Sequence, residues 1–144
     1  MSIGFELMSG EKGRDLALLL LRLALGGVFI FHGVHKLMGM EGTIAFFGTI
    51  GFAVWVAWLV AITETVTGVM MIVGVFTNIA AWIMATILAV AIIKVHFVHG
   101  FWVMNSGYEY TLFMLLTAVA VAHLGHGNFA ICRKCTSESG KCSM

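Results

Sequence analysis

The sequence lacks proline and has few charged residues, and these absences already exclude several classes of protein. Without proline, no helix of the chain is kinked by that residue. Charged residues make up 10% of the 144 residues and the net charge is +1, which gives no support for a nucleic-acid partner. Residues 1–15 are polar and mixed in charge, and no small-residue cleavage site follows the first apolar run. We therefore expect that run to be retained as a helix rather than removed as a signal peptide.

Hydrophobic residues dominate what is present, at 60% of the chain with a mean hydropathy of +1.02. Four apolar runs are long enough to cross a bilayer, which takes roughly 20 residues. Unpaired backbone groups are not tolerated in lipid, so these runs are predicted to be helices. The predicted spans are about 16–37, 53–76, 78–98 and 108–124.

The short links between these runs predict an all-α integral membrane bundle of four helices with up-down-up-down topology. Residues 1–131 form its single transmembrane domain, and residues 132–144 form a polar, cysteine-containing tail. Lys and Arg gather on the side that holds both termini, whereas the loops near 38–52 and 99–107 contain none. The positive-inside rule then places both termini and the tail in the cytoplasm. The predicted location is the plasma (inner) membrane of a prokaryote, as a multi-pass protein.

Ionisable side chains inside a membrane are energetically costly, so each of them is a candidate functional residue. The alternating topology predicts that most of them meet in the outer half of the bundle. They are His32, His35, Lys36, Glu64, Lys94, His96, His99 and Glu109.

The helical faces refine this placement. His96 and His99 continue a stripe of alanines, so they are predicted to point into the bundle. Lys94 lies about 200° from His96 on a helical wheel and is predicted to extend to the interface. Arg22 lies deeper in the first helix, at a depth that differs from that of Glu64 by roughly 6 Å at about 1.5 Å per residue. An Arg22–Glu64 ion pair is therefore predicted, either as a structural pair or with Glu64 as a proton acceptor.

Three cofactor interpretations fit the two His-x2-His pairs. His32, His35, His96 and His99 are candidate metal ligands, two of them are candidate axial haem ligands, and imidazoles also hydrogen-bond quinone oxygens and relay protons. A structural role at the membrane interface is the fourth interpretation. In the tail, Cys132-x2-Cys135 is typical of a metal site or a redox dithiol, although a reducing cytosol also keeps such thiols free.

Several motifs resemble the DoxX family of small four-helix membrane proteins, which includes the DoxD-type subunit of thiosulfate:quinone oxidoreductase. The resemblance covers most of residues 18–131, and the chain departs from the family pattern in lacking a proline before the second helix. The matching positions are Arg22, Gly26, Phe29, His32, Gly33, Lys36, Glu64, Thr67, Gly68, Gly74, Thr77, His96, Gly100, Phe101, Glu109 and Tyr110.

The resemblance implies a non-autonomous subunit of a quinone-linked membrane oxidoreductase, with a peripheral or periplasmic redox protein as partner. Alternatives are a non-catalytic anchoring subunit of a respiratory complex or homo-oligomer, and a haem- or metal-binding protein. For the first hypothesis the candidate catalytic residues are Glu64, His96 and Glu109. The candidate quinone-binding residues are Arg22, His32, Lys36, His96 and Phe101.

Overall fold

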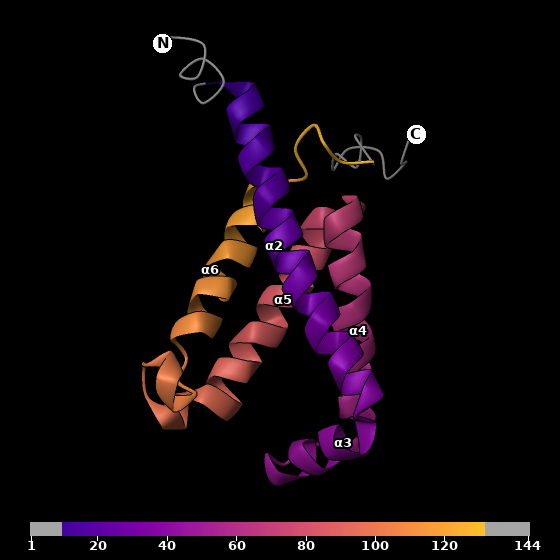
Figure 1. The fold of residues 1–144 in the computed structure, drawn as a ribbon, viewed down its shortest axis with the longest axis vertical. Helices are drawn as coiled ribbons and strands as arrows, with labels where there is room; N and C mark the ends of the chain where they lie inside the picture. Colours follow the sequence, from indigo (N-terminus) through magenta and orange to yellow (C-terminus); the bar gives the residue numbers. More distant parts are fainter. Residues whose placement is uncertain (1–9, 132–144) are drawn as a thin grey trace.

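The chain is mostly helical over the residues that the computed structural model describes, which are 10–131 (Figure 1). The predicted all-α class is confirmed, and no strand occurs in that range. The main helices are α2 (Glu11–Met38), α3 (Met40–Thr49), α4 (Val54–Val73), α5 (Thr77–Ala91) and α6 (Glu109–Leu124). A π-helical turn, Ile92–His96, and a 3₁₀ turn, Phe97–His99, extend α5, and a second 3₁₀ turn covers Val103–Asn105.

Within residues 10–131, three helical segments are long and apolar enough to cross a membrane: Glu11–Met38, Val54–Val73 and Thr77–His99. The fourth, α6, is apolar but has 16 residues. At 1.5 Å per residue it is about 24 Å long, shorter than the hydrocarbon core of about 30 Å. The chain is thus a multi-pass membrane protein with three long spans and a shorter fourth helix.

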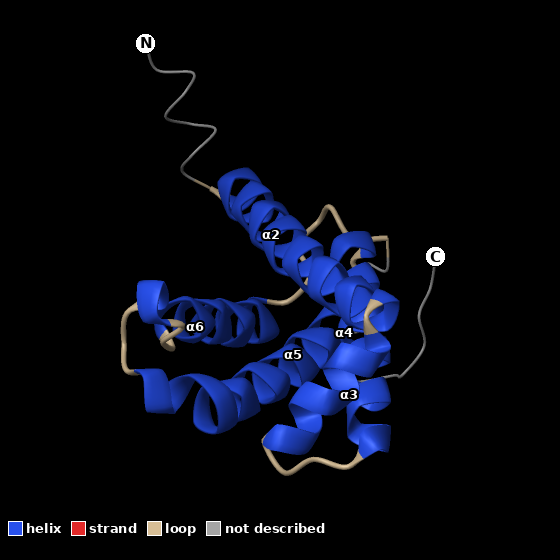
Figure 2. Cartoon of the chain, turned by 60° about the horizontal axis from the view of Figure 1, so that its bottom comes forward, coloured by secondary structure: helices blue, strands red, loops and turns tan. Residues whose placement is uncertain are grey.

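The helices associate as two antiparallel pairs. Helix α2 packs along α4, and α5 packs along α6 (Figures 1 and 2). Residues 10 and 131 lie at one end of the bundle, which we call the closed end. Helix α3 and the connection between α5 and α6 lie at the opposite end, where the two pairs move apart, and we call this the open end. The core at the junction of the pairs includes Leu25, Phe29, Met71, Met84, Met114 and Val121.

One element was not expected. The segment between the first two spans, predicted as a loop over 38–52, contains the ten-residue helix α3. It lies across the open end, and its Phe47 is buried while its Phe46 is exposed. The aromatic and aliphatic residues of this segment therefore form part of the bundle rather than a solvated connection.

Glycines set the close approach of α2 and α4. A methyl group added at Gly33 would lie 2.6 Å from the backbone nitrogen of Thr65, and one added at Gly68 would lie 2.8 Å from that of Ile30. Real side chains do not fit at such distances from a rigid backbone. Small residues at these crossings let the two helix backbones meet, which is how helices associate in membranes.

This packing predicts the effect of a single methyl group. Gly33→Ala should lower the free energy of unfolding by about 2 kcal/mol, since overpacking a well-packed contact costs about 1–3 kcal/mol. Gly27→Ala, six residues earlier on α2, is the matched control, because a methyl group there meets nothing within 4 Å. Unfolding in mixed detergent micelles measures both, and equal stability of the two variants would contradict the close crossing.

Candidate functional site

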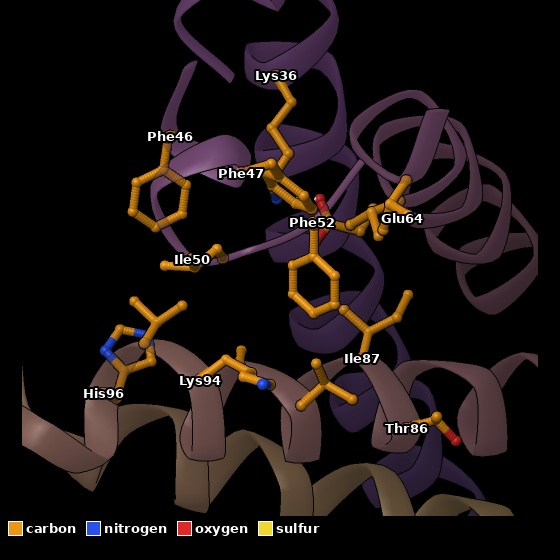
Figure 3. A pocket seen from close by; sticks show the side chains of 15 residues that line it. Lys36, Phe46, Phe47, Ile50, Phe52, Glu64, Thr86, Ile87, Lys94 and His96 are labelled. Carbon is orange, nitrogen blue, oxygen red and sulfur yellow. Dashed lines mark hydrogen bonds and ion pairs between the residues drawn. The ribbon is translucent and has the colours of Figure 1, made fainter. Parts of the chain in front are cut away.

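A cleft opens between the two helix pairs toward the open end, and its larger lobe has a volume of about 500 Å³ (Figure 3). Its walls are apolar and rich in phenylalanine, with side chains from α3, the following turn, α4 and α5. The apolar residues are Phe46, Phe47, Ile50, Phe52, Val56, Val60, Ile87, Val90, Ala91 and Val95. Four ionisable side chains reach the same lobe: Lys36, Glu64, Lys94 and His96.

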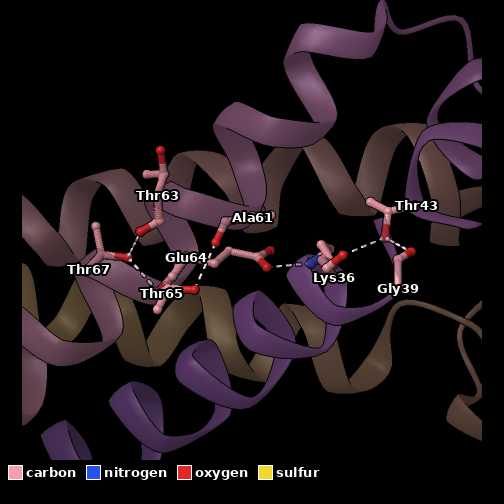
Figure 4. Close-up of polar contacts among 8 residues, drawn as sticks. All are labelled: Lys36, Gly39, Thr43, Ala61, Thr63, Glu64, Thr65 and Thr67. Carbon is pink, nitrogen blue, oxygen red and sulfur yellow. Dashed lines mark hydrogen bonds and ion pairs between the residues drawn. The ribbon is translucent and has the colours of Figure 1, made fainter. Parts of the chain in front are cut away.

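An ion pair between Lys36 Nζ and Glu64 Oε2 joins α2 to α4 inside this cleft (Figure 4). The side chain of Lys36 is 24% exposed and that of Glu64 is 8% exposed, so most of the surface of the pair is covered by other residues. Helical side chains lean toward the N-terminus of their own helix. Because α2 and α4 are antiparallel, Lys36 and Glu64 lean toward each other, and the close crossing at Gly33 brings their helices within reach.

His96 lines the cleft from the π-helical turn at the end of α5. Its Nδ1 lies 2.7 Å from the carbonyl oxygen of Ser106, a residue in the left-handed region at φ 62°. A carbonyl oxygen only accepts, so Nδ1 carries the hydrogen. In the neutral imidazole Nε2 is then a hydrogen-bond acceptor, and the loop after α5 fixes the tautomer of a side chain that lines the cleft.

A smaller lobe of about 220 Å³ lies between α2, α5 and α6. The ion pair, Ile87, Ala91 and His96 line both lobes, so these residues form the boundary between them. His32 from α2 and Tyr110 and Thr111 from α6 line the smaller lobe and do not line the larger one. The candidate site is thus an apolar lobe and a more polar lobe that share one ionic boundary.

The sequence of the chain is similar to those of known proteins. The sequence model of the DoxX family matches residues 17–100, more than half of the chain. The chain belongs to the DoxX family. A protein of Bacillus subtilis (strain 168) named "Putative oxidoreductase CatD" is 39% identical over 115 residues, which cover 80% of this chain and 84% of that protein. No solved structure matches the chain.

Within the DoxX match, Arg22 has a different partner from the one predicted. Its guanidinium is completely buried and donates to four backbone carbonyl oxygens. The acceptors are Met71 (3.0 Å), Ile72 (3.0 Å), His126 (2.9 Å) and Phe129 (3.4 Å). The predicted Arg22–Glu64 ion pair is therefore wrong, because Glu64 pairs with Lys36 and Arg22 lies level with the last turn of α4. Arg22 ties the closed end together and does not line the cleft.

The four outer histidines of this DoxX protein do not form one ligand set. His35 lines neither lobe, and its ring stacks on Phe31 with 6.3 Å between centroids. His99 is exposed, and its Nδ1 lies 2.9 Å from the carbonyl oxygen of Val95 on its own helix. Across residues 10–131, no three His, Cys, Asp or Glu side chains come together as a metal site. Cys132 and Cys135 lie outside the described residues.

Two further predicted site residues lie outside both lobes. Glu109 Oε2 accepts a hydrogen bond from the backbone N–H of Val103 at 3.0 Å, so this carboxylate holds the 3₁₀ turn of the loop. Phe101 packs edge-to-face against Trp102 and Tyr108. Both residues therefore shape the loop that positions Ser106, the partner of His96.

Lys94 and the phenylalanines of α3 line the larger lobe, which was not predicted from the sequence. Lys94 was predicted to extend to the interface, and it is exposed, but its Nζ also lies 6.0 Å from the Phe52 ring at the edge of the larger lobe. The aromatic walls from α3 were missed because that segment was interpreted as a loop. The signal that marks them is the mostly apolar run between Gly42 and Gly48, residues 43–47.

Proposed function

We propose that this DoxX protein is a membrane subunit of a quinone-linked oxidoreductase and that the larger lobe binds the quinone. One observation carries the proposal: a phenylalanine-walled apolar cleft that contains a shielded Lys36–Glu64 ion pair and His96. Binding sites for small molecules commonly combine apolar walls with a few convergent polar groups. Family membership and the name of the Bacillus relative support an association with membrane oxidoreductases.

The proposed roles follow from the hydrogen-bonding capacity of each group. When bound, a quinone accepts two electrons and two protons. The Lys36 ammonium has three donors and gives one to Glu64, which leaves donors for a quinone oxygen. His96 Nε2, an acceptor in the neutral ring, binds the hydroxyl group of the reduced form. Glu64 balances the charge of Lys36, and Phe46, Phe47 and Phe52 provide an apolar surface for a ring and its tail.

We further propose that the open end faces the outside of a prokaryotic plasma membrane. Among the described residues, Lys12 and Arg14 lie in the first turns of α2, at the closed end, whereas the connections over 39–52 and 99–107 at the open end contain no Lys or Arg, in agreement with the positive-inside rule. Electrons would then come from a peripheral or periplasmic redox protein that docks at the open end. In this arrangement the chain supplies the quinone site, and its partner supplies the reductant.

A pair of histidine variants tests the proposal. His96→Phe removes both ring nitrogens from the cleft, and the Kd of the purified protein for a short-chain quinone should rise about tenfold, the equivalent of one lost hydrogen bond. His99→Phe is the matched control three residues away, because His99 is exposed and bonds its own helix. Its Kd should stay within twofold of the original value. Quenching of tryptophan fluorescence in nanodiscs measures the binding. Absence of saturable quinone binding in the unmodified protein would refute the proposed function.

A further inference from the structure

The smaller lobe combines a cavity with polar side chains that have no hydrogen-bond partner among residues 10–131. The imidazole of His32 and the hydroxyl groups of Tyr110 and Thr111 line it and make no hydrogen bond to any residue in 10–131. Its volume of about 220 Å³ has room for several water molecules at about 30 Å³ each. A buried water needs two to four polar partners. These three groups, with the ion pair, provide them.

The lobe also extends from the ionic boundary to the surface of the bundle. Lys36, Glu64 and His96 form its inner side, where they also face the larger lobe. His32 and Tyr110 are exposed, and Tyr110 is 45% exposed. The two residues come from α2 and α6, the helices that move apart toward the open end (Figure 1). Proton-carrying groups therefore line the lobe both at the shielded ion pair and at the surface of the bundle.

We propose that the smaller lobe holds water and is the proton route to the larger lobe, with His32 and Tyr110 as relay residues. This role rests on the proposed quinone function. The titratable groups that face the lobe are His32, Lys36, Glu64, His96 and Tyr110. For each quinone reduced, the partner protein supplies two electrons and the lobe supplies two protons. An ammonium that gives its proton to a quinone oxygen becomes an amine, and a proton passed along the water of the lobe restores it.

The assignment gives His32 a role different from the one predicted from the sequence. His32 was expected to hydrogen-bond a quinone oxygen, but it lines the smaller lobe and not the larger one. It lies one helical turn from Lys36 on α2, close to the ion pair. His32 therefore delivers protons to the site and does not bind the quinone.

Hydroxyl-radical footprinting of the unmodified protein tests for the water directly. Met114 is 5% exposed and lines the smaller lobe, whereas Met71 and Met84 are completely buried and line neither lobe. Radicals formed from water in the lobe should oxidise Met114 at least tenfold faster than the other two methionines, measured by mass spectrometry with ¹⁸O-labelled water. Equal protection of all three would overturn the proposal. This experiment needs neither quinone nor partner.

A second experiment tests the relay. The rate at which bound quinone is reduced by electrons from an electrode that carries the immobilised protein should fall about tenfold in His32→Leu, with no change in quinone Kd, and added imidazole should restore part of the rate. The control is His35→Leu, which changes a histidine of α2 that lines neither lobe and should keep the original rate. An unchanged rate in His32→Leu would overturn the relay while the quinone site stands. If the unmodified protein binds no quinone, the proposed function and the proton role fail together, and footprinting still decides whether the lobe holds water.

Discussion

Glu64→Gln should lower the free energy of unfolding by about 3 kcal/mol, because it leaves the ammonium of Lys36 charged and unpaired in an apolar cleft. Breaking a buried ion pair by removing one partner typically costs about 3–5 kcal/mol. The side chain of Glu64 is 8% exposed and that of Lys36 is 24% exposed, which places the expected loss at the lower end of that range. Unfolding in mixed detergent micelles measures the loss, and quinone affinity measured on the same samples should fall.

The double variant separates stability from binding. Lys36→Met combined with Glu64→Leu removes both charges and keeps similar volumes, and such replacements are often neutral or stabilising. We expect its stability to return to within about 1 kcal/mol of the original protein, while its quinone affinity stays low. Glu41→Gln, an exposed change at the start of α3, serves as the control. Recovery of quinone binding in the double variant would show that the pair is structural and takes no part in the site.

Arg22→Leu should destabilise the protein by at least 3 kcal/mol and release the segment that follows α6. The guanidinium is fully buried, and its four hydrogen bonds join α2 to the end of α4 and to residues 126 and 129. Hydrogen bonds to a charged group contribute about 1.5–3 kcal/mol each. The negative end of the α4 dipole further stabilises the cation. Limited proteolysis should detect new cleavage after Leu124, in addition to the loss measured by unfolding.

Two other arginine variants show which property of Arg22 causes the loss of stability. Arg22→Lys keeps the charge but not the planar fork of donors, so its loss of stability should lie between those of the leucine variant and the original protein. Arg14→Leu alters an exposed arginine two turns earlier on α2 and should change stability by no more than about 0.5 kcal/mol. A leucine variant at Arg22 with unchanged proteolysis would contradict the proposed attachment of the terminal segment.

The helices were predictable from the sequence because their determinants are local. Apolar runs of membrane length and the absence of proline predict helices without knowledge of their neighbours. The predicted boundaries of the second span, 53–76, lie close to those of α4, Val54–Val73. Helix α3 was missed because ten residues are too few for a span, and the segment between two spans was therefore predicted as a loop.

The partners of the ionisable residues were less predictable, because they depend on how helices slide and rotate against each other. Counting residues from the helix ends placed Arg22 and Glu64 within reach of each other. The close contact of Gly33 with Thr65 sets the true register, and it places Lys36 beside Glu64. The glycines at the helix crossing therefore determine the register of α2 against α4, which cannot be obtained by counting residues along each helix.

The histidines illustrate a second limit. His96 and His99 share a sequence spacing that suggested a joint role, yet one lines the cleft and the other bonds its own helix. The structure between them changes from a π-helical to a 3₁₀ turn, and no feature of the local sequence predicts that change. A spacing rule that assumes a regular α-helix fails where the helix is irregular.

The π-helical turn at Ile92–His96 has a consequence for comparing members of the family. Such a turn accommodates one more residue than the corresponding α-helical turn. Each residue of an α-helix rotates the chain by about 100°. A relative with one residue fewer in this turn would carry its histidine on a different side of the helix, even where a sequence alignment shows the residue as identical. Alignment gaps near this position are therefore as important as substitutions when a role of this histidine in one family member is inferred from another.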